Sequence, residues 1–429
     1  MRKMKDSGIE WLGNIPSNWH TVPLKRNFTI YSGATPNSEK IEYWNGNIPW
    51  ITPADYKTKD IYISHGKKFL TETGYLSCGT SMIPTGSIIF SKRAPIGSVA
   101  INSQELCTNQ GCLSCVPKHN IAIKYYYYLM SVETEQFELV GSGTTFKEIS
   151  ANALANFLLP SPPIHEQSRI ANFLDEKCAL IDRLVERHQE VIEKLKAYRQ
   201  SVISETVTRG LDPDAPMKDS GIPWIGKIPE GWKIDKIKYI SKFNPGCSRH
   251  FDHYESVGYL PMECLKHGFM TPLKTKYEKI TGALTCFEDG DIVLAKVTPC
   301  FENGNIAIAH NLENHTGFGS SELFVFRCSG YETRFLFYIF QNSNFMNECI
   351  STMTGTGGLK RVSSDFIRNC RIPVPDLQLQ QQIADYLDEK CAKIDRIIHD
   401  KEQIISKLAE YKKSIIYEYV TGKKEVPAS

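Results

Sequence analysis

Apolar residues recur with alternating spacings of three and four between Glu166 and Thr208, a stretch with no interior Gly or Pro. This spacing places one apolar stripe along an α-helix and is typical of helices that pack against another long helix. Polar His188 and Arg199 interrupt the stripe. The pattern predicts a helix that begins near Pro162 and ends near Gly210, with the stripe formed by Leu174, Cys178, Ile181, Val185, Ile192, Leu195 and Val202.

The same pattern returns near the C-terminus, where Asp376 is a candidate N-cap and Gly422 a stop signal. Equivalent residues lie 213 positions apart, as Leu174 and Leu387 do, and the polar interruptions return as Lys401 and Lys412. Each helix would be roughly 60 Å long at about 1.5 Å per residue. We expect the two to form an antiparallel coiled coil with a stripe of Leu387, Cys391, Ile394, Ile398, Ile405, Leu408 and Ile415. The last seven residues are expected to fray.

The rest of the chain is also repeated. The segment Met4–Trp19 returns as Met217–Trp232, again 213 positions later. Between each opening segment and its helix, short β-branched runs alternate with turn residues, which predicts strands. Helices are predicted at Lys124–Val140 and Glu332–Phe345. The expected strands are Asp60–Ser64, Ser87–Ser91, Ser98–Asn102, Cys112–Val116, Asp291–Lys296 and Asn305–His310.

The repeat predicts an α+β fold with pseudo-two-fold symmetry: two β-rich domains separated by two long helices. The predicted boundaries are a first domain at 1–160, a first helix at 161–212, a second domain at 213–375, and a second helix with its tail at 376–429. The centres of the two domains do not keep the 213 offset, since Gly86 aligns with Gly290. We infer that the domains share a fold but have different targets.

Composition narrows the protein class. The 429 residues are 41% hydrophobic, and no apolar run is long enough to cross a membrane. Thirteen cysteines without a secretory signal predict reduced thiols in a cytoplasmic protein. The net charge of +2 says little by itself, although residues 1–160 (+3) and 217–375 (+2) carry small basic excesses.

Two motifs have a functional and a plain interpretation. Cys107, Cys112, Cys115 and His119 have zinc-ligand chemistry, but CLSCV alternates like a half-buried strand with Cys112 and Cys115 on opposite faces, which we favour. Asp376 and Asp388 imitate a metal nuclease signature, but both lie along one helix, where Asp388 is expected to be an ordinary surface residue. No arrangement of Ser, His, Asp or Cys has the spacing of a catalytic site.

Polar and basic residues beside predicted turns are the candidates for DNA contacts, because Arg and Lys bind phosphates or guanine while Asn and Gln can read adenine. They recur in both domains, partly beside Gly-rich loops that follow Val140 and precede Lys360. The set comprises Lys92, Arg93, Asn109, Gln110, Thr144, Thr145, Lys147, Lys296, Thr298, Asn303, Asn305, Lys360 and Arg361.

The order of these motifs resembles that of specificity subunits of type I restriction–modification systems. The motifs are Gly8–Trp19 with Gly221–Trp232 and Gln167–Asp175 with Gln380–Asp388, and the resemblance covers nearly the whole chain. One difference is Leu379, which stands where the first copy has Glu166. The resemblance implies two target recognition domains, each reading one half of a split asymmetric site in double-stranded DNA, with the helices setting the spacing.

The resemblance also implies partners. Methyltransferase subunits using S-adenosylmethionine and motor-nuclease subunits using ATP and magnesium would assemble on this non-catalytic chain, which itself would hold no metal or cofactor. The residues expected to contact the partners are Trp11, Trp19, Trp224, Trp232, Gln167 and Gln380. For the tryptophans, packing within their own domain is the favoured alternative. The main rival function is a coiled-coil scaffold whose two domains bind proteins.

Overall fold

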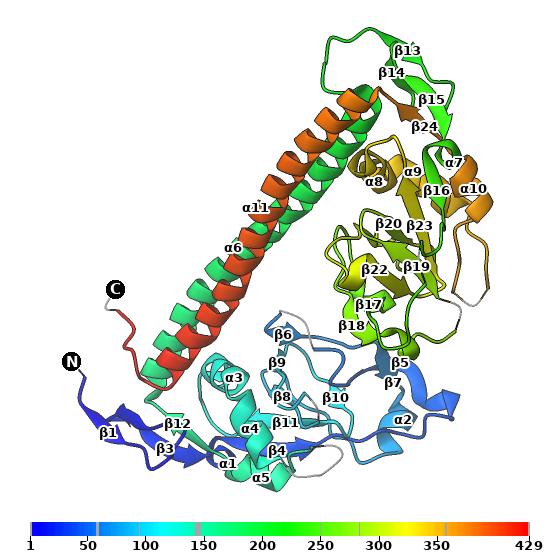
Figure 1. Ribbon diagram of the computed structural model, residues 1–429. Helices are drawn as coiled ribbons and strands as arrows, with labels where there is room; N and C mark the ends of the chain where they lie inside the picture. The colour runs from blue at the N-terminus through cyan, green and yellow to red at the C-terminus, as the bar shows by residue number, and fades with distance from the viewer. Residues whose placement is uncertain are drawn as a thin grey trace. The chain divides into compact units, whose positions relative to one another are not determined.

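The structure, a computed structural model, describes residues 2–56, 60–93, 95–141, 147–248, 250–282, 284–356 and 358–427. The chain divides into two compact units, which are described separately: residues 1–188 with 403–429, and residues 189–402. Each unit combines one β-rich domain with one end of each long helix, α6 (Ile164–Arg209) and α11 (Leu377–Val420) (Figure 1).

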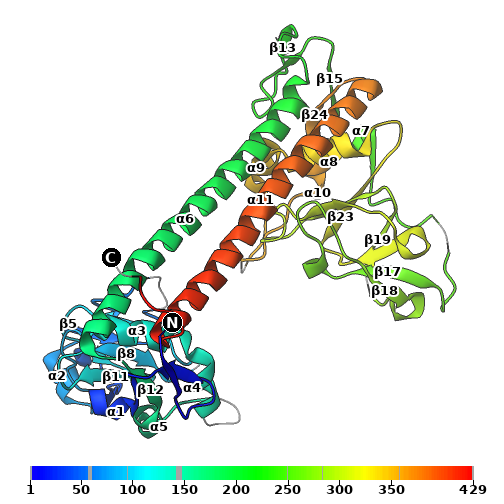
Figure 2. The same ribbon diagram turned by 90° about the vertical axis from the view of Figure 1, so that its left-hand side faces the viewer.

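The long helices run antiparallel within each unit (Figures 1 and 2). In the first unit Phe173 packs on Tyr419 with ring centroids 4.5 Å apart. Nine residues further along α6, Asp182 binds Lys412 of α11 at 2.7 Å. In the second unit Arg199 of α6 pairs with Asp395 of α11 at 3.1 Å. The predicted stripe positions are all buried or half-buried, so the antiparallel coiled coil is confirmed.

The ends of both helices follow the predicted signals. Backbone N–H groups at the start of α6 donate to the carbonyl oxygen of Pro163, and the Asp376 carboxylate accepts the N–H of Leu379 at 2.9 Å at the start of α11. Gly210 and Gly422 end the helices with positive φ angles of 81° and 72°. A side chain at Gly422 would meet Pro16 at 2.5 Å, so this stop also needs glycine for space.

The domain of the first unit contains two main sheets. One is five-stranded in the order β4-β11-β8-β9-β6, and the other is three-stranded in the order β10-β5-β7. Two short pairs, β1 with β2 and β12 with β3, complete it. Its elements are β1 (Met4–Asp6), β2 (Asn14–Pro16), β3 (His20–Pro23), α1 (Leu24–Asn27), β4 (Phe28–Ser32), η1 (Ile41–Tyr43), β5 (Trp44–Ile51), β6 (Tyr62–Ile63), β7 (Lys68–Leu70), α2 (Glu72–Leu76), β8 (Ile88–Ser91), β9 (Val99–Asn102), β10 (Cys107–Thr108), β11 (Cys112–Pro117), α3 (Ile123–Val132), α4 (Thr134–Val140), α5 (Ala151–Asn156) and β12 (Leu158–Ser161).

The domain of the second unit has the same plan. Its main sheets have the orders β16-β23-β20-β21 and β18-β17-β22-β19, with β13 paired to β14 and β15 to β24. Its elements are β13 (Met217–Asp219), β14 (Lys227–Pro229), β15 (Lys233–Lys236), α7 (Ile237–Ile240), β16 (Ser241–Phe243), β17 (Ser256–Leu260), η2 (Met262–Cys264), β18 (Leu273–Lys276), η3 (Tyr277–Lys279), β19 (Thr285–Glu288), β20 (Ile292–Ala295), β21 (Ile306–Ile308), η4 (Glu313–His315), β22 (Thr316–Gly319), β23 (Leu323–Cys328), α8 (Thr333–Gln341), α9 (Ser343–Ser351), α10 (Ser364–Asn369) and β24 (Arg371–Val374).

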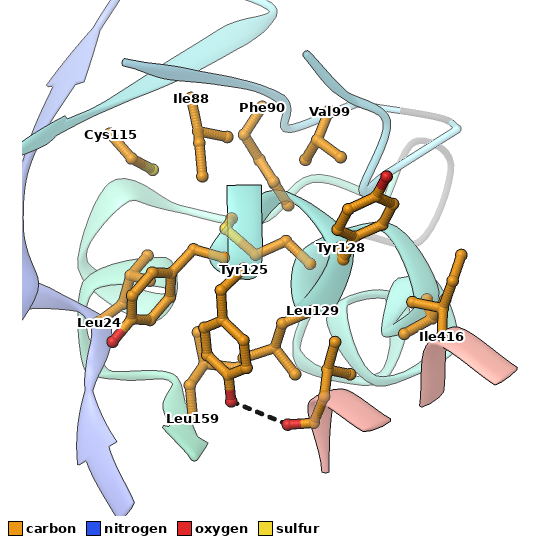
Figure 3. Close-up of a cluster of buried hydrophobic side chains, with 14 of the residues drawn as sticks. Leu24, Ile88, Phe90, Val99, Cys115, Tyr125, Tyr128, Leu129, Leu159 and Ile416 are labelled. Atoms are coloured by element: carbon orange, nitrogen blue, oxygen red, sulfur yellow. Dashed lines mark hydrogen bonds between the residues drawn. The ribbon is translucent and has the colours of Figure 1, made fainter. Parts of the chain in front are cut away.

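One apolar core joins the domain of the first unit to both long helices. Helix α3 lies between the five-stranded sheet and the helix pair, and its Tyr125 is fully buried. Figure 3 shows this ring among Leu129, Leu159 and neighbouring apolar side chains. The Tyr125 hydroxyl donates to the carbonyl oxygen of Val420 in α11 at 2.8 Å. In the second unit, the domain and both helices likewise share one core.

Several predictions need correction. The helix expected at Lys124–Val140 is two helices, α3 and α4, and the one expected at Glu332–Phe345 is likewise α8 and part of α9. The strand CLSCV is buried on both faces, because the domain packs a core against each side of its sheet.

Two expectations about the thiols and the tail also fail in part. Cys247 and Cys286 form a disulfide, while the other eleven cysteines are free. The C-terminal tail is bonded to the rest of the unit as far as Val426 and does not fray there. Lys423 donates to the carbonyl oxygens of Leu12 and Asn14, and Arg169 donates to that of Val426.

Candidate nucleic-acid interface

Most of the predicted DNA-contacting residues of the first domain meet where β8 ends. The N–H of Lys92 donates to the carbonyl oxygen of Gly111, and the Lys92 carbonyl accepts the N–H of Ile149, both at 3.0 Å. These two bonds join the end of β8 to the turn before β11 and to the segment that follows the Gly-rich loop. We call Lys92, Arg93, Asn109, Gln110, Lys147 and Glu148 the first polar cluster.

Glu148 neutralises part of the charge in this cluster. Its carboxylate pairs with Lys92 at 2.6 Å and with Arg93 at 2.8 Å. Hydrogen bonds from these two cations lower the pKa of Glu148. Two cations therefore share one anion, and Arg93, with half of its side chain exposed, is the one more open to a DNA phosphate.

The remaining members differ in their exposure and in the hydrogen bonds that their side chains make within the domain. The Asn109 carboxamide oxygen accepts the N–H of Gly111 at 2.9 Å, so it shapes the turn. Gln110 is exposed and its oxygen accepts the Thr35 hydroxyl, while Lys147 is exposed. Thr144 and Thr145 lie outside the described residues.

The second domain forms a matching second polar cluster, comprising Lys296, Thr298, Asn303, Asn305, Glu322, Lys360 and Arg361. The N–H of Lys296 donates to the Glu322 carbonyl oxygen at 3.0 Å, and the Lys296 carbonyl accepts the N–H of Val362 at 2.9 Å. These are the backbone connections of Lys92, so the two clusters are structurally equivalent.

The charges of the two clusters are arranged differently. Arg361 stands 213 positions after Glu148, and Glu322 takes the place of Gly111. Arg361 binds Glu322 at 2.8 Å, which lowers the pKa of this carboxylate. At this shared backbone junction, the acidic residue of each domain therefore lies where the other domain has a basic or uncharged residue.

One candidate in the second cluster has a structural role. The Thr298 side chain is 8% exposed, and its hydroxyl donates to Gly358 O at 2.8 Å and accepts the N–H of Lys360 at 2.9 Å. Its hydroxyl proton and one acceptor site are used within the domain, and a DNA contact through Thr298 stays a prediction. Asn303 and Lys360 are exposed, Asn305 is half-buried, and Lys296 lies over the Phe324 ring at 5.5 Å.

The four tryptophans of the opening segments pack within their own units. Trp19 is fully buried and donates to Glu166 at 2.7 Å, and Trp232 is 4% exposed. The favoured packing interpretation is thus confirmed for these two. Trp11 stacks on Phe157 and Trp224 packs against Phe345, but both remain partly exposed. A partner contact stays a prediction for Trp11 and Trp224.

The two glutamines are interior residues. The Gln167 carboxamide accepts the N–H of Ala122 at 3.1 Å and donates to Pro162 O at 2.9 Å. Gln380 makes the equivalent bonds in the second unit. Since both side chains are at most 4% exposed, the structure does not fit direct contact with a partner through them.

Neither alternative metal site converges. Cys107, Cys112 and Cys115 belong to three different apolar clusters, and His119 is exposed. Asp376 caps α11, whereas Asp388 binds Arg334 and Tyr338, so Asp388 is not the ordinary surface residue that the sequence suggested. Among the described residues, no group of acidic, His and Cys side chains could hold a metal ion, and no helix is long and apolar enough to span a membrane.

A family model for the type I restriction modification DNA specificity domain matches the chain twice, at residues 16–195 and 229–407. This chain belongs to that family. Each match contains one of the two polar clusters and most of one long helix.

Relatives within this specificity family are similar over different extents. The MjaIX specificity subunit of Methanocaldococcus jannaschii is 32% identical over 55% of this chain and 54% of its own length. The EcoR124I/EcoR124II specificity subunit of Escherichia coli is 29% identical over 46% and 49%. The chain thus spans about half the length of these relatives, whereas the MjaVIII specificity subunit of M. jannaschii aligns over 95% and 93% at 22% identity.

Two solved structures related to type I restriction–modification systems share the fold. A structure described as the basis of complex assembly and conformational transition of the type I R-M system matches with a TM-score of 0.73 at 15% identity, covering 96% of this chain and 99% of that one. The HsdS subunit from Thermoanaerobacter tengcongensis matches with a TM-score of 0.53 at 16% identity, covering 96% and 98%.

The acidic members of the clusters, Glu148 and Glu322, are not among the residues predicted from the sequence, because that prediction was limited to groups that attract DNA. A signal was available, because Glu148 and Arg361 occupy the same repeat position with opposite charges. Such a reversal in an otherwise matched junction marks a position where the two domains differ in charge.

Proposed function

We propose that this chain is the sequence-reading subunit of a type I restriction–modification complex. Each β-rich domain would read one half of a split, asymmetric site in double-stranded DNA, and the paired helices would set the spacing between the halves. The observation that supports this most directly is the pair of family-model matches, one for each domain. The exchanged charges at equivalent junctions support two different half-sites.

The chain would act as a non-catalytic subunit in the cytoplasm. Modification subunits would methylate adenine with S-adenosylmethionine, and restriction subunits would cleave with ATP and magnesium. The names of the relatives, which are specificity subunits of type I restriction enzymes, support this division of labour. Trp11 and Trp224 remain the candidate partner contacts, since both are partly exposed at the opening segments.

Sequencing of adenine methylation in cells tests the proposal. The chain would be expressed with its modification subunits, and the same subunits without the chain would serve as the control. We expect a split, asymmetric methylated motif that depends on the chain. A variant with one extra helical turn in both α6 and α11 should methylate the same half-sites at a new spacing.

Two results would contradict the proposal. A purified intact complex that methylates no new motif would favour the protein-binding scaffold. If the lengthened variant methylates DNA with unchanged spacing, the helices do not set the spacing between the half-sites. The proposal that the domains read the sequence would be unaffected.

A further inference from the structure

In the first unit, a carboxylate on α6 holds the domain helix α3. The Tyr128 hydroxyl donates to one oxygen of Asp175 at 2.7 Å, and the Lys124 ammonium pairs with the other at 2.5 Å. Tyr128 and Lys124 are four residues apart and therefore lie on one face of α3. Figure 3 shows the Tyr128 ring at the edge of the apolar cluster, with its hydroxyl directed away from Leu129 and Ile416. We call these three residues the first docking cluster.

The second unit contains an equivalent second docking cluster. The Tyr338 hydroxyl donates to one oxygen of Asp388 at 2.7 Å, and Arg334 pairs with the other at 2.7 Å. The helix residues Asp175 and Asp388 are 213 positions apart, but the domain residues Tyr128 and Tyr338 are only 210 apart. The contact thus persists in both copies although insertions and deletions have shifted the domains relative to the helices.

A second bond holds the same domain helix near its first turn. Gln167, eight residues before Asp175 on α6, accepts the N–H of Ala122 just before α3. Gln380 likewise accepts the N–H of Glu332 just before α8 at 3.0 Å. Each domain helix is therefore fixed to its long helix at two points, with buried Ile170, Ala171 and Leu174, or their counterparts, between them.

The two polar contacts fix the orientation of the domain helix, which apolar packing alone leaves adjustable. An apolar surface gains free energy from burial without a preferred direction, so packed helices can slide or rotate slightly. A charge-assisted hydrogen bond requires a defined distance and angle. We propose that Asp175 and Asp388 are positioning residues. Each fixes the rotation of its domain about the helix pair and the position of the domain along the helix axis. If the domain shifts on the helices, the spacing of the half-sites should change. This consequence rests on the proposed function.

The two clusters differ in redundancy. Arg334 also binds Glu332 at 2.9 Å and Asp385 at 2.7 Å, so it keeps carboxylate partners when Asp388 is removed. Lys124 pairs only with Asp175 among the carboxylates that the structure describes. Loss of Asp175 should therefore loosen its domain more than loss of Asp388.

A distance measurement within the first unit of the full-length chain tests the positioning role. Spin labels carried by non-canonical amino acids would replace His119 in the domain and Arg187 in α6, both of which are exposed. We expect one narrow distance distribution for the wild type. In Asp175→Ala, the population of molecules in which the domain has moved from its position on α6 should rise roughly tenfold, as expected for a lost hydrogen bond to a charged group.

Matched variants separate positioning from folding. Tyr128→Phe removes only the hydroxyl and should broaden the distribution to an intermediate degree. Glu176→Ala changes the neighbouring exposed carboxylate and should match the wild type. A distribution in both Asp175→Ala and Tyr128→Phe that equals that of Glu176→Ala would overturn the proposal.

Methylation by the assembled complex gives the functional readout. We expect Asp175→Ala to keep both half-site sequences but to accept spacings that differ by a base pair, with a smaller effect for Asp388→Ala. Unchanged spacing in Asp175→Ala would contradict the positioning role. If the wild-type complex methylates no split motif, the proposed function fails, and the distance distributions alone decide whether Asp175 positions the domain.

Discussion

Glu133, between α3 and α4, is a carboxyl group whose burial should make the first unit pH-dependent. Its residue is 3% exposed, and one carboxyl oxygen has no hydrogen-bond partner among the described residues. Burial raises the pKa of Glu133 to about 7, whereas Lys413 of α11 lowers it and Glu135 of α4 raises it by smaller amounts. The equivalent residue of the second unit is neutral Asn342, which caps α9.

The sign and size of the effect follow from proton linkage. The folded unit binds the proton more tightly than the unfolded chain, so this contribution to stability is complete below pH 4.5 and is lost as the pH rises through 7. A pKa raised from 4.5 to about 7 corresponds to about 3 kcal/mol at pH 8, since one pKa unit equals about 1.4 kcal/mol. Glu133→Gln removes the charge but keeps the shape, and should stabilise the unit by that amount at pH 8.

Hydrogen exchange of the α3 and α4 amides in the full chain measures this difference. Comparing variant and wild type at each pH cancels the intrinsic exchange rates. We expect the free energies of opening to differ by under about 1 kcal/mol at pH 5 and by about 3 kcal/mol at pH 8. Glu135→Gln, whose side chain is 78% exposed, is the control and should show no such trend. Parallel pH profiles for Glu133→Gln and wild type would refute the reasoning.

Three other results are expected. Replacing Lys92 and Arg93 together by Ala should weaken DNA binding by the assembled complex, and should reduce the slope of log K against log salt by about 1 and not 2, because Glu148 already neutralises one charge; an unchanged slope would remove these residues from the DNA interface. Leu174→Ala should destabilise the first unit by about 2–5 kcal/mol in hydrogen exchange, since this side chain is fully buried, whereas Leu180→Ala on the exposed side of α6 should have little effect. Thiol titration of the oxidised, denatured chain should give eleven reactive groups, and thirteen after reduction; thirteen without reduction would show that the Cys247–Cys286 disulfide does not form.

The candidate site was predictable only in part. The sequence located the junctions around Lys92 and Lys296, because basic residues beside turns are visible as local patterns. It could not show that Glu148 neutralises Lys92 and Arg93, since these residues are more than 50 positions apart and meet only when β8, the turn before β11 and the segment after the Gly-rich loop are assembled. For the same reason Thr298 looked available, although folding directs its hydroxyl to the backbone of 358–360.

The sequence by itself determined the repeat, the two long helices, their caps and the α+β class. These features depend on periodicity and on the backbone preferences of Gly, Pro and capping residues, which act over a few neighbouring positions. The tertiary structure alone decided the roles of Gln167, Asp175 and their counterparts. Along the helix Asp175 is one carboxylate among several, and it differs from Glu176 only because the packed domain brings Lys124 and Tyr128 to its side of α6.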